Sequence, residues 1–192
     1  MSGRRIVLAS ANPHKAAEFA RLLPGHDVTQ FDGELPPETG TTFLENARLK
    51  ALHVHRAANA PAWVLADDSG IEAAALGGAP GVYSARYAGE SATDAQNLAK
   101  LLDELRGRDD RRVRYVAELV AVSPEGRELH ARGELRGTLA AEPRGDGGFG
   151  YDPAFVADGE SRTVAEMSAA EKDAISHRAR AAAALRPQLP AE

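Results

Sequence analysis

Cysteine is absent from this 192-residue chain, so disulfide bonds and thiolate metal sites are excluded. The sequence also lacks a signal-like segment and any long apolar stretch, so we expect a cytoplasmic protein with no membrane partner. A basic surplus is missing as well, because the formal net charge is −5, and this argues against bulk binding of nucleic acid. A site for a polyanion must therefore be a local cluster of Lys and Arg, assisted by a metal ion.

Lysine is scarce, because only four lysines occur beside nineteen arginines. A lysine within a motif-like segment is therefore a slightly stronger indication of function, although a composition bias alone would give the same ratio of lysine to arginine. Hydrophobic residues make up 43% of the chain, which is enough to bury a core. At this length we expect a single domain over residues 1–192, either with one lobe or with two.

Strand and helix signals alternate in the first half of the chain. Apolar runs typical of buried strands occupy 4–10, 27–31 and 63–66, and 71–75 is a further candidate. Asn12 suits the N-cap of a helix over about 13–23, and Thr42 with Glu45 has capping-box spacing for a helix to about Asn59. The second helix has five apolar positions that we expect inside, namely Leu44, Ala47, Ala51, Leu52 and Val54.

The second half of the chain contains a hairpin signal between helical segments. Thr93 and Gln96 cap a predicted helix that carries four leucines. Further predicted elements are a hairpin of 113–122 with 127–136, a short strand at 155–156, and helix from Thr163 onward with a break near Ser176. This order predicts an α/β protein with a mixed sheet.

The segment Ser10-Ala11-Asn12-Pro13-His14-Lys15 places a turn between a predicted strand and a helix N-terminus. Backbone N–H groups without helical partners and the helix dipole favour an anion at such a point. Ser10, Asn12 and Lys15 add side-chain donors and a charge. An ordinary, well-capped turn would have the same sequence, and the spacing of a Walker loop is absent.

Asp67 and Asp68 follow the predicted strand 63–66 and precede Ser69 and Gly70. The carboxyl end of a strand is where open α/β sheets bind ligands. Adjacent residues on an extended chain point to opposite faces, so we expect the two aspartates to have different tasks. One carboxylate suits Mg²⁺, and the other suits the orientation or deprotonation of water. A solvated turn is the alternative.

The interpretation of two further charged residues, Glu38 and Lys50, depends on the wider pattern of segments. Glu38 is a candidate second metal ligand, although a lone glutamate in a loop is usually solvated. Lys50 either neutralises phosphate charge or is a surface lysine. For Glu45, the capping role is favoured.

The glycine-rich loop 147–153, together with Gly145, matches G-x-G-x-x-G. We reject a dinucleotide fingerprint, because no strong strand precedes the loop and no helix follows it. We interpret it as a flexible loop that presents Phe149 for stacking on a base, with Asp152 reading an edge. Burial of Phe149 in the core is the alternative, and the flanking glycines argue against it.

Lys172, His177 and Arg178 gather near the expected helix break at Ser176. They offer donors to phosphate or carbonyl oxygens. A charged, solvated helix face would have a similar sequence.

Seven segments, in the same order and nearly end to end, resemble the inosine triphosphatase family. They are 8–15, 38–40, 43–47, 66–70, 76–87, 147–153 and 171–178. The chain departs from the pattern at Ala11, where the family often has glycine, and this departure would stiffen the first turn. The resemblance implies an elongated α/β fold: a mixed, twisted β-sheet flanked by helices, with two lobes and an active-site cleft between them.

The resemblance also implies a homodimer that depends on Mg²⁺ and hydrolyses ITP, dITP and XTP to the monophosphate and pyrophosphate. Glu38 and Asp68 would hold the metal, with Asp68 and Lys50 catalytic and with Lys15, Lys50 and Lys172 offsetting charge on the pyrophosphate. The implied substrate-binding residues are Ser10, Ala11, Asn12, Pro13, His14, Lys15, Ser69, Phe149, Gly150, Tyr151, Asp152, Lys172, His177 and Arg178.

Two other functions remain open at this point. One is a related-fold pyrophosphatase that acts on modified pyrimidine nucleotides. The other is a nucleotide-binding regulator without catalysis, which the two aspartates disfavour.

Overall fold

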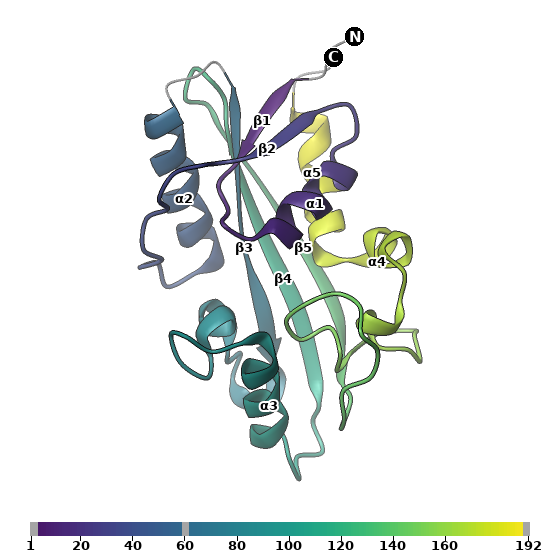
Figure 1. Ribbon diagram of the computed structural model, residues 1–192. Coiled ribbons are helices and arrows are strands. Elements are labelled where there is room, and N and C mark those ends of the chain that lie inside the picture. Colours follow the sequence, from purple (N-terminus) through teal and green to yellow (C-terminus); the bar gives the residue numbers. More distant parts are fainter. Residues whose placement is uncertain (1–3, 59–61, 190–192) are drawn as a thin grey trace. The chain divides into compact units, whose positions relative to one another are not determined.

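The computed structural model describes residues 4–58 and 62–189 (Figure 1). Contacts within the chain divide it into two compact units. Unit 1 comprises Met1–Asp68, Ala117–Gly133 and Arg178–Glu192, and unit 2 comprises Ser69–Val116 and Glu134–His177. The expectations of a single domain, an elongated shape and a cleft between two lobes stay predictions.

Six strands form one sheet in the order β2-β1-β3-β4-β5-β6. Their bounds are β1 Arg5–Leu8, β2 Asp27–Gln30, β3 Trp63–Ala73, β4 Arg112–Val122, β5 Glu128–Leu139 and β6 Phe155–Ala157. β1 runs parallel to β2 and to β3, whereas β6 runs antiparallel to β5. The prediction of an α/β fold with a mixed sheet is therefore confirmed.

Five α-helices accompany the sheet in the described residues. They are α1 Pro13–Leu22, α2 Phe43–Ala58, α3 Asp94–Glu104, α4 Ala169–Ile175 and α5 His177–Leu185. Short 3₁₀ segments occupy Ala74–Leu76, Gly81–Arg86, Val164–Glu166 and Arg186–Gln188. Among residues 4–58 and 62–189, no helix combines the length and the apolar character needed to cross a membrane.

Local capping signals are present at the starts of α1 and α3. The Asn12 side chain accepts a hydrogen bond from the backbone N–H of His14, and Thr93 and Gln96 form a reciprocal capping box. The predicted end of the second helix at Asn59 lies outside the described residues. Ser176 is extended between α4 and α5, which confirms the predicted break.

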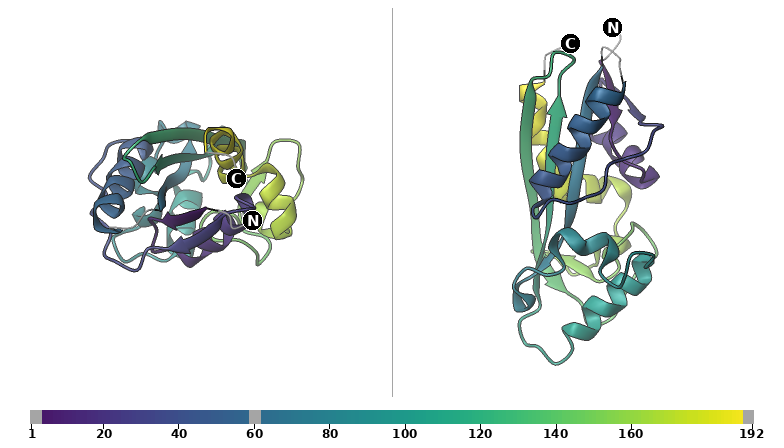
Figure 2. Two further views of the ribbon diagram at one scale, coloured as in Figure 1. Left: turned by 90° about the horizontal axis from the view of Figure 1, so that it is seen from above. Right: turned by 90° about the vertical axis from the view of Figure 1, so that its left-hand side faces the viewer.

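In unit 1, helices cover both faces of the strands (Figure 2). The two-residue repeat of β1 sends Ile6 and Leu8 to a core with α1 and α5, and sends Val7 to a core with α2. The expectation that Leu44 lies inside is wrong, because its side chain is 37% exposed. The buried stripe of α2 runs through Phe43, Ala47, Ala51 and Val54, and Leu44 lies off it.

The core of unit 2 forms where α3 meets aromatic residues of the strands. Leu98, Leu101 and Leu105 of α3 belong to the same buried cluster as Tyr115 and Phe155. The rings of Tyr115 and Phe155 stack with their centroids 4.3 Å apart. Tyr115 is thereby fixed on β4 beside the glycine-rich loop, whose Tyr151 belongs to the same cluster.

The expected strand 63–66 and residues 71–73 of the expected strand 71–75 belong to one continuous strand, β3, so the prediction that the aspartates end a strand is wrong. The strand that ends here is β1, whose last residue, Leu8, pairs with Leu65. β3 continues because β4 lies on its other side. Asp67 and Asp68 thus lie just beyond the carboxyl end of the neighbouring parallel strand.

Gly70 lets β3 pass close to the segment Gly81–Arg86. A Cβ at position 70 would collide with Ser84 Oγ and lie 2.7 Å from the Gly81 carbonyl oxygen. Ser84 Oγ accepts a hydrogen bond from Ile71 N–H at 2.9 Å and donates to that carbonyl at 2.6 Å. Close packing against Ser84 and Gly81 therefore explains the glycine at position 70.

Candidate active site

A short polar turn connects β1 to α1 in unit 1. Ser10 Oγ accepts from Asn12 N–H at 3.1 Å, and Asn12 Oδ1 accepts from His14 N–H at 2.9 Å. Gln30 Nε2 donates to the Ser10 carbonyl oxygen at 2.6 Å. These bonds fix the turn at the N-terminus of α1 and place Lys15 in its first helical turn.

Asp67 gathers two cations from two different helices. Its Oδ2 lies 2.6 Å from Lys15 Nζ, on α1, and 3.3 Å from Arg178 Nε, on α5. Arg178 Nη1 also lies 3.3 Å from Glu18 Oε2. Asp67, Glu18 and Arg178 are all buried. Two carboxylates thus balance two cations on this face of β3.

Asp67 is an ionised partner within this group. Burial raises the pKa of Asp67, but the charges of Lys15 and Arg178 outweigh burial and hold that pKa below its ordinary value. A carboxylate that already binds two cations is well placed to hold them in position. The arrangement favours bracing by Asp67 over coordination of a metal.

Asp68 faces a different group of residues. Lys50 Nζ, on α2, lies 2.9 Å from Asp68 Oδ1 and 2.7 Å from Glu38 Oε1. Asn46 Nδ2 donates to Asp68 Oδ2 at 3.3 Å, and Asn46 Oδ1 accepts from Gly40 N–H at 2.7 Å. Asn46 therefore links β3 to the loop that carries Glu38. Because Asp67 and Asp68 contact different partners, the expectation that they point to opposite faces is confirmed.

The Asp68 carboxyl retains its proton more readily than an isolated aspartate does. Burial and the negative charge of Glu38 raise the pKa of Asp68 to about 6, although the Lys50 ammonium opposes this shift. Burial lowers the pKa of Lys50, which is 6% exposed, but Asp68 and Glu38 outweigh burial and hold it above its ordinary value. Lys50 stays charged between two acids.

The Glu38 and Asp68 pair suits a divalent cation. Both carboxylates converge on one ammonium, which marks a position where positive charge is stabilised. Their oxygens are the hard ligands that Mg²⁺ prefers. Within the part of the chain that the structure describes, no three His, Asp or Glu side chains gather into a metal-binding group. The protein would therefore supply two carboxylates, and water or phosphate oxygens would complete the coordination.

In unit 2, Asp152 organises the glycine-rich loop. Its Oδ1 accepts from Tyr115 O–H at 3.0 Å, and its Oδ2 accepts from Phe149 N–H at 3.0 Å and from Lys172 Nζ at 2.6 Å. Lys172 Nζ also lies 4.6 Å from the centroid of the Phe149 ring. Phe149 is half-buried, so it is neither a core residue nor a freely exposed one.

Two other residues of unit 2 that were predicted to bind substrate, His177 and Tyr151, lie in its interior. His177 is buried, and its ring stacks on Tyr115 at a centroid distance of 4.7 Å. Tyr151 is also buried, and its hydroxyl donates to the Ser84 carbonyl oxygen at 2.8 Å. Burial raises the pKa of Tyr151, so this hydroxyl stays protonated.

The structure brings the predicted residues together in two groups, one in each unit. Unit 1 holds the turn 10–15 with Glu38, Lys50, Asp68 and Arg178, and unit 2 holds Ser69, 149–152, Lys172 and His177. Ala11, Pro13 and His14 are exposed, and Ser69 is half-buried on β3. Their roles toward a substrate stay predictions.

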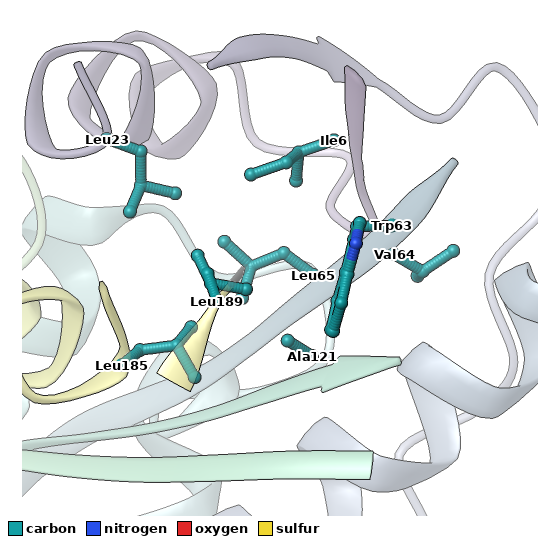
Figure 3. Close-up of a pocket in the computed structure, with 8 residues that line it drawn as sticks. All are labelled: Ile6, Leu23, Trp63, Val64, Leu65, Ala121, Leu185 and Leu189. Carbon is teal, nitrogen blue, oxygen red and sulfur yellow. The ribbon is translucent and has the colours of Figure 1, made fainter. Parts of the chain in front are cut away.

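A separate apolar crevice lies in unit 1 (Figure 3). Its lining consists of Ile6, Leu23, Trp63, Val64, Leu65, Ala121, Leu185 and Leu189. Such a lining does not suit a polyphosphate or a metal ion, so this crevice is not a candidate for the same chemistry.

A protein-family model described as the Ham1 family matches residues 6–188 of this chain. The chain belongs to the Ham1 family.

Curated proteins and a solved structure are similar to this chain over nearly their whole length. The dITP/XTP pyrophosphatase of Ralstonia nicotianae is 52% identical over 197 residues, covering 97% of this chain and 96% of that protein. The dITP/XTP pyrophosphatase of Deinococcus deserti is 48% identical, covering 96% and 89%. A solved HAM1 protein from Coxiella burnetii is 40% identical with a TM-score of 0.86, covering 97% and 98%. The resemblance predicted from the sequence is confirmed.

In the two groups of residues, sequence reasoning missed Glu18 and Asn46 in unit 1 and Tyr115 in unit 2. Glu18 lies three residues after Lys15, and Asn46 lies four residues before Lys50, so each shares a helix face with a candidate lysine. A polar residue at that spacing was an available signal. Tyr115 had none, because an aromatic residue in a strand is typical of any core.

The first prediction concerns the titration of Asp68 in the metal-free protein. We expect its carboxyl signal, followed by NMR, to titrate with a midpoint near pH 6. Lys50→Met should raise the midpoint, because an opposing positive charge is lost. Glu38→Gln should lower it, because a neighbouring negative charge is lost. A midpoint near the value of an exposed aspartate, about 4, would contradict this electrostatic account.

The second prediction concerns the ion pair of the half-buried Lys15 with the fully buried Asp67. Asp67→Asn should lower the free energy of unfolding by about 3 kcal/mol or more, because it leaves the buried Arg178 and the half-buried Lys15 without their shared carboxylate. In the Asp67→Asn variant, Lys15→Met should lower the free energy of unfolding much less than it does in the wild type, because it removes a charge that has already lost its partner. Chemical denaturation of the two single variants and the double variant measures this coupling. Additive effects would show that the two residues do not stabilise each other.

Proposed function

We propose that this Ham1-family protein is a nucleoside triphosphate pyrophosphatase that hydrolyses deaminated purine nucleotides. Its substrates would be dITP, XTP and ITP, and its products the monophosphate and pyrophosphate. The names of the relatives from Ralstonia nicotianae and Deinococcus deserti support this assignment. The observation that carries it is the convergence of Glu38 and Asp68 on the ammonium of Lys50.

Mg²⁺ is the proposed cofactor, with Glu38 and Asp68 as its protein ligands. When bound, it supplies polarisation of phosphate oxygens and a lower pKa for bound water. Asp68 orients the attacking water or accepts its proton. Lys50 contributes positive charge that offsets the charge developing on the leaving pyrophosphate. Asn46 holds Asp68 and the loop of Glu38 in register.

The phosphate chain is assigned to the turn 10–15 and to Ser69. Backbone N–H groups at the start of α1 attract an anion, and Lys15 adds a full positive charge. Asp67 keeps Lys15 and Arg178 in place on the face of β3 opposite to Asp68. In this assignment Asp67 is a brace, and Asp68 is the reactive carboxylate.

The purine base is assigned to the loop of unit 2. Phe149 stacks on the ring, and Asp152, His177 and Arg178 frame its polar edge. Lys172 lies beside Phe149, so we assign its ammonium to the base rather than to the pyrophosphate. Protein donors that face the 6-oxo group of a deaminated purine would find no acceptor in adenine, which has an amino group at that position. Such a mismatch disfavours ATP and dATP as substrates.

The same proposal covers the setting of the enzyme. We place it in the cytoplasm, where it would remove deaminated purines from the nucleotide pool, and we expect a homodimer.

The third prediction is the substrate profile. In a pyrophosphate-release assay with Mg²⁺, dITP, ITP and XTP should react with a much higher kcat/KM than dATP, dGTP or modified pyrimidine triphosphates. Asp68→Asn should fold as the wild type does and lose about 100-fold or more in kcat. Asp103→Asn, an exposed aspartate of α3, serves as the matched control and should keep full activity.

Preference for a modified pyrimidine triphosphate would replace this function by the related pyrophosphatase activity. Absence of turnover on every triphosphate would favour a nucleotide-binding regulator. Wild-type kcat in Asp68→Asn would remove Asp68 from the mechanism.

A further inference from the structure

Asp94, the first residue of α3, reaches the glycine-rich loop 56 residues further along the chain. Its Oδ2 accepts a hydrogen bond from Gly150 N–H at 2.7 Å. Both residues belong to unit 2. Asp94 is in none of the groups assigned so far, yet it holds the residue that directly follows Phe149.

The helix that carries Asp94 is itself firmly anchored. Asn97 lies three residues later, on the same face of α3, and it is buried. Asn97 Nδ2 donates to the Ala85 carbonyl oxygen at 3.0 Å, and Asn97 Oδ1 accepts from Ala88 N–H at 2.8 Å. Leu98 and Leu101 continue this face into the core. Asp94 is thus presented to the loop by a fixed element.

On the loop, two consecutive backbone amides are each held by a carboxylate. Phe149 N–H donates to Asp152 Oδ2, and Gly150 N–H donates to Asp94 Oδ2. Gly150 has a φ of 64°, a left-handed conformation that favours glycine. Gly148 has a φ of 71°, and a Cβ there would collide with the Asp152 carboxylate. The peptide units on both sides of the Phe149 ring are therefore fixed.

We propose that Asp94 is a positioning residue for stacking of the base on Phe149, an inference that rests on the proposed function. By accepting from Gly150 N–H, Asp94 holds the loop in its base-binding conformation before the nucleotide arrives. Such preorganisation reduces the entropy lost on binding, so it strengthens binding of the base.

A simpler role for Asp94 makes different predictions. An acidic residue in the first turn of a helix interacts favourably with the helix dipole. That role depends on the negative charge of Asp94 and leaves the loop unaffected. The hydrogen bond depends on an acceptor oxygen, which asparagine also provides.

The test compares Asp94→Ala, Asp94→Asn and Asp103→Ala with the wild type. Asp103 is the matched control, because it lies on the same helix, is 68% exposed and pairs with Arg106. One readout is amide hydrogen exchange of residues 147–152 in the nucleotide-free protein. The other is the separate determination of KM and kcat for dITP hydrolysis with Mg²⁺.

Asp94→Ala should accelerate amide exchange in the loop and raise KM for dITP on the order of tenfold, with kcat close to that of the wild type. Asp94→Asn should restore slow exchange and a KM near that of the wild type. Asp103→Ala should change neither readout.

Three results would overturn the inference: unchanged exchange in Asp94→Ala, unchanged KM in that variant, or an Asp94→Asn variant as impaired as Asp94→Ala. The last would show that the loop depends on the negative charge of Asp94 and that an acceptor oxygen alone does not hold it. A wild-type protein that does not hydrolyse dITP overturns the proposed function and this role together. An active wild type with an unaffected Asp94→Ala variant overturns this role alone.

Discussion

Neighbouring side chains of an extended strand point to opposite faces of the sheet, and the site in unit 1 depends on this constraint at Asp67 and Asp68. Asp67 meets Lys15 and Arg178, whereas Asp68 meets Lys50 and Asn46. One dipeptide therefore organises two groups with different chemistry. A shift of β3 by one residue would exchange the two carboxylates, so the pairing of β3 with β1 also determines which of them is reactive.

The two faces also differ in charge balance. Around Asp67, two carboxylates face two cations, and the group is neutral. Around Asp68, two carboxylates face one ammonium, which leaves an excess of negative charge. Buried ion pairs contribute little net stability, and apolar residues often replace them without loss. A cation-dependent function explains the presence of both Glu38 and Asp68 better than a contribution to stability does. The balanced charges around Asp67 suit a structural brace.

Features that depend on nearby residues were predictable from the sequence. The caps at Asn12 and Thr93 follow from local hydrogen bonds, and the opposite orientation of Asp67 and Asp68 follows from strand geometry. The continuity of β3 was not predictable, because it depends on β4, about forty residues away in the chain. Asp94 was missed for the same reason, since its partner, Gly150, is brought to it only by the folded chain. Asn46 had a local signal in its helical spacing from Lys50, but its contact with Asp68 likewise depends on the folded chain.

The central claim is that Glu38 and Asp68 form the cation site and that Asp67 does not. Anomalous diffraction from crystals grown with Mn²⁺ as a substitute for Mg²⁺ tests this claim most directly. The account predicts an anomalous peak bound by the carboxylates of Glu38 and Asp68, with Asp67 still paired to Lys15. A peak bound by Asp67, or no peak at Glu38 and Asp68 in crystals of a protein with metal-dependent turnover, would contradict it.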